Sequence, residues 1–266
     1  MDYRFLFEKF VLRQHHFETQ VRKTLKRIRG DTFVDVGANA GFYSLLLRRN
    51  FVHVFAYEPN PSTFTVLGDR TWRYHNIRTR QMALSDTEGR VPLFTGFRDK
   101  GRIKGKVIDG SASILNEWTY KPPNGADDFR VGSSKLNVVC STFDRQFDGG
   151  LHTFDLVKID VEGAEFLVLK GMQQSLEKER VTALMIELHD RTRRAELENL
   201  LNRFGFHLRW VDPGHLLAMK GWQGVLATRR ARLASFLDRL YDDEADRSYW
   251  EQLSSRLHAS AKALAM

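Results

Sequence analysis

Apolar residues in the first half of the chain form short runs that alternate with amphipathic segments. The runs 32–36, 52–57 and about 77–83 have the length and composition of buried strands. Helix-like segments lie between them, at about 42–49 and 62–69. Strands that alternate with helices in this way predict parallel β-α-β units, in which the carboxyl ends of the strands share one edge of the sheet. The first half therefore predicts an α/β fold.

The same alternation returns in the second half of the chain, after a short strand at 91–95 and an interruption. Further strands are predicted at 136–140, 154–160, 182–188 and 206–211, with helices from Glu162 to about Ser175 and over 192–204, and a terminal hairpin of 215–219 and 224–228. Together these elements predict a doubly wound, mostly parallel sheet of seven strands. Ligands of such sheets bind at the carboxyl ends of the strands.

Three segments do not follow this alternation. Residues 1–30 repeat apolar positions at helical spacing and end in basic residues, which predicts a helix packed on the central domain; contact with a membrane surface or with RNA is the alternative. Residues 96–134 are rich in glycine and charge without a clear period, so we predict an insertion that covers the cofactor crevice as a lid over the acceptor site. Residues 229–266 predict a charged helical tail, and either terminal helix could form a homodimer contact. The central domain is thus expected over 31–228.

Composition narrows the classes of function. The 266 residues are 42% hydrophobic, which suits one large domain with additions. The formal net charge of +8 is spread along the chain, and it allows an anionic partner without locating one. A single cysteine, Cys140, excludes an internal disulfide and a thiol cluster for zinc. With no membrane-length apolar run and no signal peptide, a cytoplasmic protein is expected.

The turn after the first predicted strand marks the candidate cofactor site. It has the form Asp35-x-Gly37-x-x-x-Gly41, and its glycines leave room for a ligand beside the N–H groups of the next helix. Neither register of this turn supplies the G-x-G-x-x-G pattern of a dinucleotide site. A carboxylate at Asp35 would instead attract the ammonium of S-adenosylmethionine. Glu58, at the end of the second strand, can accept both ribose hydroxyls, and Asp86 is a candidate for the adenine amino group.

Two later strand ends carry charged side chains at alternate positions. If the strand persists, Lys158, Asp160 and Glu162 fall on one side, and Glu187 and His189 do the same on the adjacent strand. Asp160 is the first candidate for the general base or the acceptor-orienting group, and Lys158 could hold a carboxylate ionised. His189, with a near-neutral pKa and oriented by Glu187, is a second candidate base. Asp160, Glu187 and His189 could also hold a divalent metal, although no spacing here favours one.

Taken together, these motifs resemble the FkbM family of methyltransferases. The resemblance rests on Val34-Asp35-Val36-Gly37-Ala38-Asn39-Ala40-Gly41, Tyr57-Glu58-Pro59-Asn60-Pro61, Ala83-Leu84-Ser85-Asp86, Val157-Lys158-Ile159-Asp160-Val161-Glu162-Gly163-Ala164-Glu165, Leu169-Lys170-Gly171 and Glu187-Leu188-His189. It covers about residues 30–210. It implies a class I (Rossmann-like) fold and an enzyme that methylates hydroxyl groups on sugars or secondary metabolites. The expected S-adenosylmethionine site comprises Asp35, Gly37, Ala38, Asn39, Gly41, Tyr43, Glu58, Asn60, Ser85, Asp86 and Asp160.

Three other classes of function stay open from the sequence. An NAD(P)-dependent oxidoreductase is disfavoured by the glycine spacing of the turn. An RNA methyltransferase is suggested by the basic charge, but the chain contains no recognisable RNA-binding module. A non-catalytic scaffold is compatible with the same fold, because fold alone does not determine function. We therefore expect a small-molecule or saccharide acceptor rather than nucleic acid.

Overall fold

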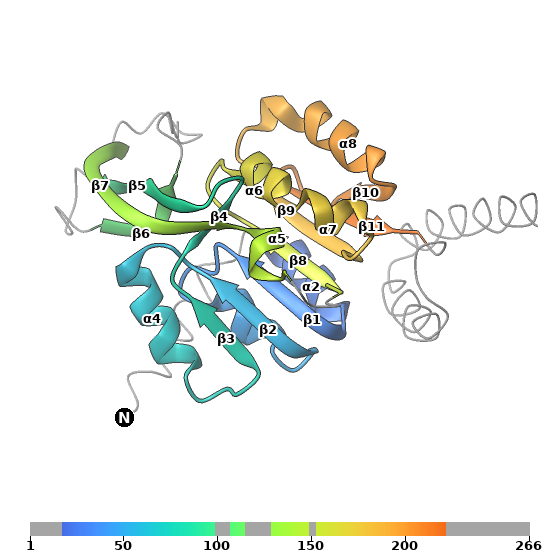
Figure 1. Cartoon of the computed structure of the whole chain (residues 1–266), viewed down its shortest axis with the longest axis horizontal. Helices are drawn as coiled ribbons and strands as arrows, with labels where there is room; N and C mark the ends of the chain where they lie inside the picture. Colours follow the sequence, from blue (N-terminus) through green and yellow to red (C-terminus); the bar gives the residue numbers. More distant parts are fainter. Residues whose placement is uncertain (1–17, 99–106, 115–128, 149–152, 222–266) are drawn as a thin grey trace, which may run out of the picture.

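The computed structural model describes residues 18–98, 107–114, 129–148 and 153–221, which form two sheets with flanking helices (Figure 1). The larger sheet has seven strands in the order β10-β11-β9-β8-β1-β2-β3. Its strands are β1 (Gly30–Val36), β2 (Phe51–Tyr57), β3 (Ile77–Arg80), β8 (Leu156–Ile159), β9 (Ala183–Glu187), β10 (Phe206–Trp210) and β11 (His215–Lys220). All neighbours in it pair in parallel except β11, which is antiparallel to both β10 and β9. The predicted seven-stranded, mostly parallel α/β sheet is confirmed.

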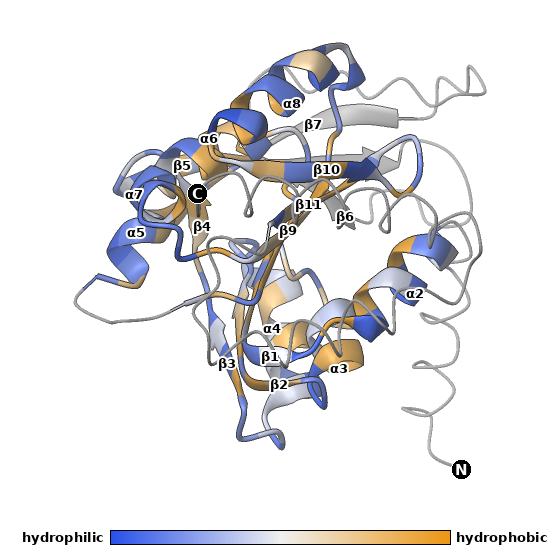
Figure 2. Cartoon of the chain, turned by 90° about the vertical axis from the view of Figure 1, so that its right-hand side faces the viewer, coloured by the Kyte–Doolittle hydropathy of each residue, from blue (hydrophilic) through white to orange (hydrophobic). Residues whose placement is uncertain are grey.

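The helices cover both faces of this sheet. They are α2 (Thr19–Arg27), α3 (Phe42–Leu47), α4 (Pro61–Thr71), α5 (Phe143–Gln146), α6 (Glu165–Gly171), α7 (Gln173–Glu177), the 3₁₀ turn η2 (Arg191–Arg193) and α8 (Arg194–Arg203). Alternate residues of the central strands enter different cores: Val34 and Ile159 pack in the cluster that includes α6 and α8, whereas Phe33 packs with α2 and α3. Figure 2 shows apolar positions along the strands and on α3. None of the helices in the described ranges is long and apolar enough to cross a membrane.

A second sheet forms where the sequence predicted a break. It contains β4 (Ala83–Ser85), β5 (Gly89–Arg98), β6 (Val107–Ser113) and β7 (Phe129–Thr142), in the order β4-β7-β5-β6. The insertion predicted over 96–134 therefore contains regular structure where its residues belong to β5, β6 and β7. Antiparallel pairing of β5 with β7 supplies the backbone hydrogen bonds, so a glycine-rich sequence without apolar alternation can still form strands. The lid function of this segment stays a prediction.

Other predicted boundaries also need correction. The run 77–83 is not one strand, because β3 ends at Arg80 on the edge of the large sheet and β4 belongs to the second sheet. The helix predicted from Glu162 to Ser175 is two helices that meet at Met172. The predicted terminal hairpin is wrong, since β11 lies between β10 and β9 and both of its edges are occupied. Residues 224–228 lie outside the described residues.

The N-terminal prediction is confirmed where it can be followed. Helix α2 buries Val21 and Leu25 completely, against the core that contains Phe33, so this part of the predicted helix packs on the domain. Its basic end, Lys26 and Arg27, lies where the negative pole of a helix favours cations. Residues 1–17 and 222–266 lie outside the described residues, and membrane contact, a homodimer and a cytoplasmic location therefore stay predictions.

Candidate functional site

The turn between β1 and α3 needs its two glycines, as predicted, but the space at Gly37 is taken by backbone rather than left for a ligand. Gly37 and Gly41 both have a positive φ, at 78° and 80°. A Cβ atom added to Gly37 would lie 1.8 Å from the carbonyl oxygen of Asp160. The turn therefore packs directly on the chain that leaves β8, and glycine is required by this backbone contact as well as by φ.

Glu58 connects this turn to the start of α4. Its Oε2 accepts a hydrogen bond from the Asn39 N–H at 2.9 Å, and its Oε1 accepts one from the Asn60 N–H at 2.9 Å. Asn60 in turn caps α4 by accepting from the Ser62 N–H at 3.1 Å. Glu58 is 6% exposed, and this burial raises its pKa to about 7 despite the two backbone hydrogen bonds. The carboxyl predicted to bind ribose is thus held rigidly at the end of β2.

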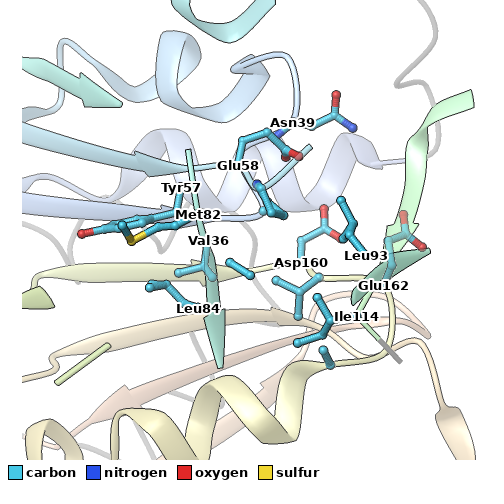
Figure 3. A pocket seen from close by; sticks show the side chains of 15 residues that line it. Val36, Asn39, Tyr57, Glu58, Met82, Leu84, Leu93, Ile114, Asp160 and Glu162 are labelled. Atoms are coloured by element: carbon cyan, nitrogen blue, oxygen red, sulfur yellow. The ribbon is translucent and has the colours of Figure 1, made fainter. Parts of the chain in front are cut away.

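A cavity opens at the carboxyl ends of β1, β2 and β8 (Figure 3). The space between its walls, together with the open solvent at its mouth, measures about 620 Å³. It is lined by Val36, Gly37, Asn39, Tyr57, Glu58, Pro59, Met82, Ala83, Leu84, Leu93, Ile114, Asp160, Val161, Glu162 and Ala164. The cavity thus brings together members of the predicted cofactor set and the first candidate catalytic residue. The sequence analysis did not predict its apolar wall of Met82, Leu93 and Ile114. Strand pairing in the second sheet brings these residues to the cavity, and such pairing leaves no local signal in the sequence.

Asp35 does not take the position predicted for it. Its side chain is 1% exposed, and the described residues that line the cavity do not include it. Oδ2 accepts a hydrogen bond from the Ser44 hydroxyl of α3 at 2.6 Å, and Oδ1 has no hydrogen-bond partner in the described part of the chain. Burial raises the pKa of Asp35, against the opposing charge of Lys158. The predicted contact with the cofactor ammonium is therefore corrected: Asp35 lies beneath α3 and acts on Lys158.

Lys158 is a buried cation between two carboxylates. It is 2% exposed, and its Nζ lies 2.8 Å from Asp160 Oδ2 and 4.8 Å from the centre of the Tyr43 ring. Burial disfavours the charge, but Asp160 and Asp35 together outweigh this effect and raise the pKa of Lys158. Burial likewise opposes ionisation of Asp160, yet Lys158 and His189 lower the pKa of that carboxyl. The predicted pairing of Lys158 with a carboxylate is thus present, with Asp160 as the partner.

The imidazole of His189 is held between two glutamates. Its Nδ1 lies 2.9 Å from Glu165 Oε1 and its Nε2 lies 3.1 Å from Glu162 Oε2, whereas Glu187 Oε1 is 3.9 Å away. Burial alone would lower the pKa of His189, but hydrogen bonds with Glu162 and Glu165 raise it to about 11. The prediction of a near-neutral base oriented by Glu187 is therefore corrected. At neutral pH this side chain is an imidazolium held by Glu162 and Glu165.

Glu162 has a backbone conformation that favours glycine. Its φ is +53°, which is unusual for a residue with a side chain, and its side chain lines the cavity (Figure 3). Strain of this kind is commonly retained at functional positions. Burial raises the pKa of Glu162, although His189 opposes the rise. The predicted strand alternation ends at Ile159, and it is the turn rather than the strand that places Glu162 beside Asp160.

Glu187 pairs with a histidine that the sequence analysis missed. Its Oε2 lies 3.3 Å from Nε2 of His215, whose Nδ1 lies 2.9 Å from Asp212 Oδ1. Burial opposes the charge on His215, but Glu187 and Asp212 raise its pKa to about 9. Residues 187 and 215 are register partners in the antiparallel pair of β9 and β11. Only that long-range register brings them together, so no local motif indicated the contact.

Several members of the predicted cofactor set support the site from outside the cavity. Asp86 Oδ2 pairs with Lys170 Nζ at 2.8 Å, and that hydrogen bond lowers the pKa of Asp86. The Ser85 carbonyl packs against Gly171, where an added Cβ would lie 1.9 Å from it. Asp86 is thus paired with α6, and its contact with adenine stays a prediction. Five other members of the predicted cofactor set are not among the described residues that line the cavity: Ala38, Gly41, Tyr43, Asn60 and Ser85.

Two groups of described side chains offer metal-ligand atoms within 4.8 Å of one another: Asp160 with Glu162 and His189, and Glu18 with Glu187 and His215. The predicted metal triad of Asp160, Glu187 and His189 is divided between them. Glu18 is the residue before α2, and its carboxylate accepts a hydrogen bond from the Tyr43 hydroxyl.

Comparison with known proteins decides which family this site belongs to. Residues 35–211, more than half of the chain, match the family model described as the methyltransferase FkbM domain. The chain belongs to the FkbM methyltransferase family. As the sequence motifs implied, this FkbM-family protein is a methyltransferase, built on a mostly parallel seven-stranded α/β sheet.

Three curated relatives illustrate the breadth of this FkbM family. The chain is 30% identical over 191 residues to methyltransferase sdnD of Sordaria araneosa, covering 66% of this chain and 73% of that protein. It is 30% identical to the 31-O-demethyl-FK506 methyltransferase FkbM of Streptomyces tacrolimicus, over 60% of this chain and 66% of that protein. It is 28% identical to the 2-O-methyltransferase NoeI of Sinorhizobium fredii, over 55% and 59% of the two chains. The chain therefore spans between about three fifths and three quarters of these relatives.

Proposed function

We propose that the protein transfers a methyl group from S-adenosylmethionine to a hydroxyl group of a small molecule or a saccharide. One observation carries the proposal: a single cavity is lined by Glu58, at the end of β2, and by Asp160 and Glu162, at the end of β8. A cofactor carboxylate site and candidate proton acceptors thus share one space. Membership of the FkbM family and the names of two relatives, a 2-O-methyltransferase and a methyltransferase of a 31-O-demethyl compound, support oxygen as the methyl acceptor.

In this proposal Glu58 binds the ribose of the cofactor. An ionised carboxylate offers about four lone-pair positions, and the N–H groups of Asn39 and Asn60 occupy two of them. Two positions are left for ribose hydroxyls. Met82, Leu84 and Leu93 form an apolar wall suited to an adenine ring. Bound S-adenosylmethionine supplies a methyl group already activated by its positive sulfur.

Glu162 is the group we assign to accept the hydroxyl proton. His189 is already protonated at neutral pH, so it cannot take a further proton. The pKa of Asp160 is lowered, which makes it a weak base and suits it to orienting the acceptor. The pKa of Glu162 is raised, so its carboxylate is a stronger base than an ordinary glutamate. The cation of His189 keeps Glu162 in position at 3.1 Å.

The proposal is tested by methyl transfer from labelled S-adenosylmethionine to a panel of sugars and hydroxylated secondary metabolites, each matched with its amine analogue. Label is expected on oxygen. Glu162→Gln is expected to lower kcat about 100-fold without changing cofactor affinity, because the amide cannot accept the proton. Glu177→Gln, an exposed change on α7, is the control and should leave kcat unchanged. Transfer only to the amine analogues contradicts oxygen as the methyl acceptor. Full turnover by Glu162→Gln contradicts the assignment of Glu162 as the proton acceptor.

The pH dependence of cofactor binding tests Glu58 separately. Because the pKa of Glu58 is raised to about 7, the carboxyl gains a proton as the pH falls through that value and loses acceptor capacity. Affinity for S-adenosylmethionine, measured by calorimetry between about pH 6 and pH 8, should therefore decrease toward the acid end. Glu58→Gln should bind about tenfold more weakly at the alkaline end and show no such slope. An unchanged slope in the variant would assign the titration to another group.

A further inference from the structure

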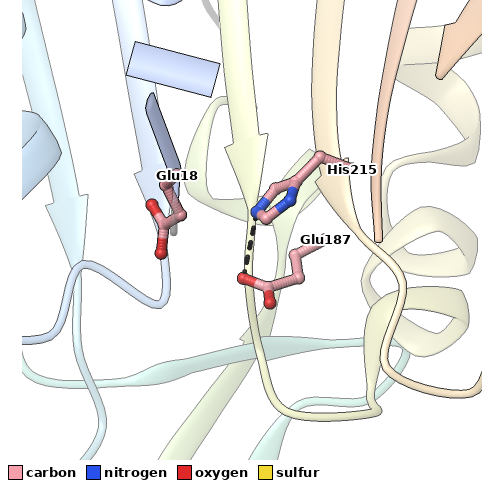
Figure 4. A group of neighbouring side chains, drawn as sticks. All are labelled: Glu18, Glu187 and His215. Atoms are coloured by element: carbon pink, nitrogen blue, oxygen red, sulfur yellow. Dashed lines mark ion pairs between the residues drawn. The ribbon is translucent and has the colours of Figure 1, made fainter. Parts of the chain in front are cut away.

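A second set of side chains lies beside the cavity, at the same edge of the sheet. It consists of Glu18, Glu187 and His215, which we call the Glu18 cluster (Figure 4). Glu18 precedes α2, Glu187 ends β9 and His215 begins β11, so three separate elements bring these side chains together. Each contributes one ligand atom, and the three atoms lie within 4.8 Å of one another.

His215 is oriented as metal-binding histidines are. The side chain is 8% exposed, and its Nδ1 lies 2.9 Å and 3.0 Å from the two carboxylate oxygens of Asp212. With Nδ1 held by Asp212, Nε2 faces Glu187 Oε2 at 3.3 Å, and a bound metal ion would take the place of the proton on this nitrogen. That Nε2 atom is buried and has no hydrogen-bond partner among the described residues. A carboxylate that fixes one ring nitrogen and leaves the other as a ligand is the usual surrounding of a metal-bound histidine.

The charges of the cluster also favour a cation. Glu18 and Glu187 place two carboxylates next to one imidazole, and Asp212 adds a third carboxylate on the far side of the ring. The nearby cation Lys158 is engaged by Asp160 at 2.8 Å. Glu18 is held in place by the hydroxyl of Tyr43, which donates to its Oε2. A divalent ion at this position would be stabilised by both carboxylates and by the imidazole nitrogen.

We propose that Glu18, Glu187 and His215 bind a divalent transition-metal ion. One imidazole nitrogen and two carboxylate oxygens suit Mn²⁺ or Zn²⁺, whereas Mg²⁺ prefers oxygen ligands alone. The ion links the N-terminal end of α2 to the edge of the sheet that carries the cavity. This binding does not depend on the identity of the methyl acceptor, so the two proposals fail independently.

The neighbouring group of Asp160, Glu162 and His189 provides an internal comparison. Both ring nitrogens of His189 already face carboxylates, Glu165 at 2.9 Å and Glu162 at 3.1 Å. In the Glu18 cluster Nε2 of His215 also faces a carboxylate, Glu187 at 3.3 Å, but that contact lacks the geometry of a hydrogen bond, and the imidazole is fixed from the other side. The ion is therefore assigned to the Glu18 cluster and not to the His189 group.

The test is Mn²⁺ binding to the full chain after metals have been removed with EDTA. Binding is measured as the decrease in the electron paramagnetic resonance signal of free Mn²⁺. One ion per chain is expected for the unsubstituted protein. His215→Ala and Glu18→Gln should weaken binding at least tenfold, and Asp212→Asn about tenfold, since it releases the imidazole without removing a ligand. His53→Ala, at an exposed position of β2, is the matched control and should bind as the unsubstituted protein does. His189→Ala removes no ligand of the Glu18 cluster and should retain the ion.

The proposal is overturned if the unsubstituted chain retains no Mn²⁺, or if His215→Ala binds Mn²⁺ as tightly as the unsubstituted chain. It is also overturned if His189→Ala, rather than His215→Ala, loses the ion. Circular dichroism establishes that each variant is folded. If His215→Ala does not fold, the near-isosteric variants Glu18→Gln and Asp212→Asn decide the result, and unchanged affinity in both contradicts the site. An equal response to Mg²⁺ and Mn²⁺ contradicts the role of the imidazole nitrogen.

Discussion

Gly37→Ala is expected to lower the free energy of unfolding by about 3 kcal/mol or more and to abolish cofactor binding. The φ of 78° places an alanine in the left-handed region, and the new Cβ would lie 1.8 Å from the Asp160 carbonyl oxygen. This oxygen belongs to the backbone, so the clash cannot be relieved by a side-chain rotation. The turn must instead move away from the end of β8, and the cavity wall moves with it. Urea unfolding and calorimetry with S-adenosylmethionine measure the two effects.

Two other glycines separate the causes of this effect. Gly89 has a φ of 115° but no atom within 4 Å of an added Cβ, so Gly89→Ala should cost only the backbone strain of about 1–3 kcal/mol. Gly68 lies within α4 with open space around it, and Gly68→Ala should stabilise the protein by about 0.5–1 kcal/mol. If Gly37→Ala is no more harmful than Gly89→Ala, the close contact between the turn and β8 is contradicted.

Lys158→Met is expected to cost about 3–5 kcal/mol of stability near neutral pH, because it leaves the buried Asp35 and the partly buried Asp160 without a compensating cation. In the unsubstituted protein the pKa of Asp160 is lowered, so its contribution is present above the ordinary carboxyl pKa and is lost as the pH falls through the lowered value. Without Lys158 the pKa of Asp160 rises, and the folded variant takes up a proton that the unfolded chain does not. The penalty should therefore shrink as the pH falls. Urea unfolding at several pH values measures it.

Two further variants support the interpretation of Lys158→Met. The double variant Lys158→Met with Asp35→Asn should recover part of the lost stability, since one buried charge is removed. Lys170→Met removes an ion pair with Asp86 in which the lysine side chain is 70% exposed, and it should cost no more than about 1 kcal/mol. Equal costs for Lys158→Met and Lys170→Met would contradict the buried network.

The central sheet could be predicted from the sequence because its strands carry local signals. The buried runs around Val34 and Val157 are short and apolar, and each is followed by a turn and a helix. The glycine turn and Glu58 sit at the ends of such strands, and a parallel sheet gathers strand ends at one edge. These features require no knowledge of long-range pairing, and the structure places them as expected.

The second sheet and the exact directions of the charged side chains depend on contacts distant in sequence. Met82 and Ile114 reach the cavity only because β4, β5, β6 and β7 pair across segments without a period. His215 meets Glu187 only through the register of β9 and β11. The direction of Asp35 had a usable signal. Since strand residues alternate, Asp35 must face opposite to Val34, which places it beneath α3.

Calorimetry of the full chain with S-adenosylmethionine and, separately, with NAD tests most directly whether this cavity is the cofactor site of a methyltransferase. One molecule of S-adenosylmethionine per chain is predicted to bind, NAD is predicted not to bind, and Glu58→Gln should weaken the first interaction. Binding of NAD without S-adenosylmethionine, or full affinity for S-adenosylmethionine in Glu58→Gln, would contradict this account.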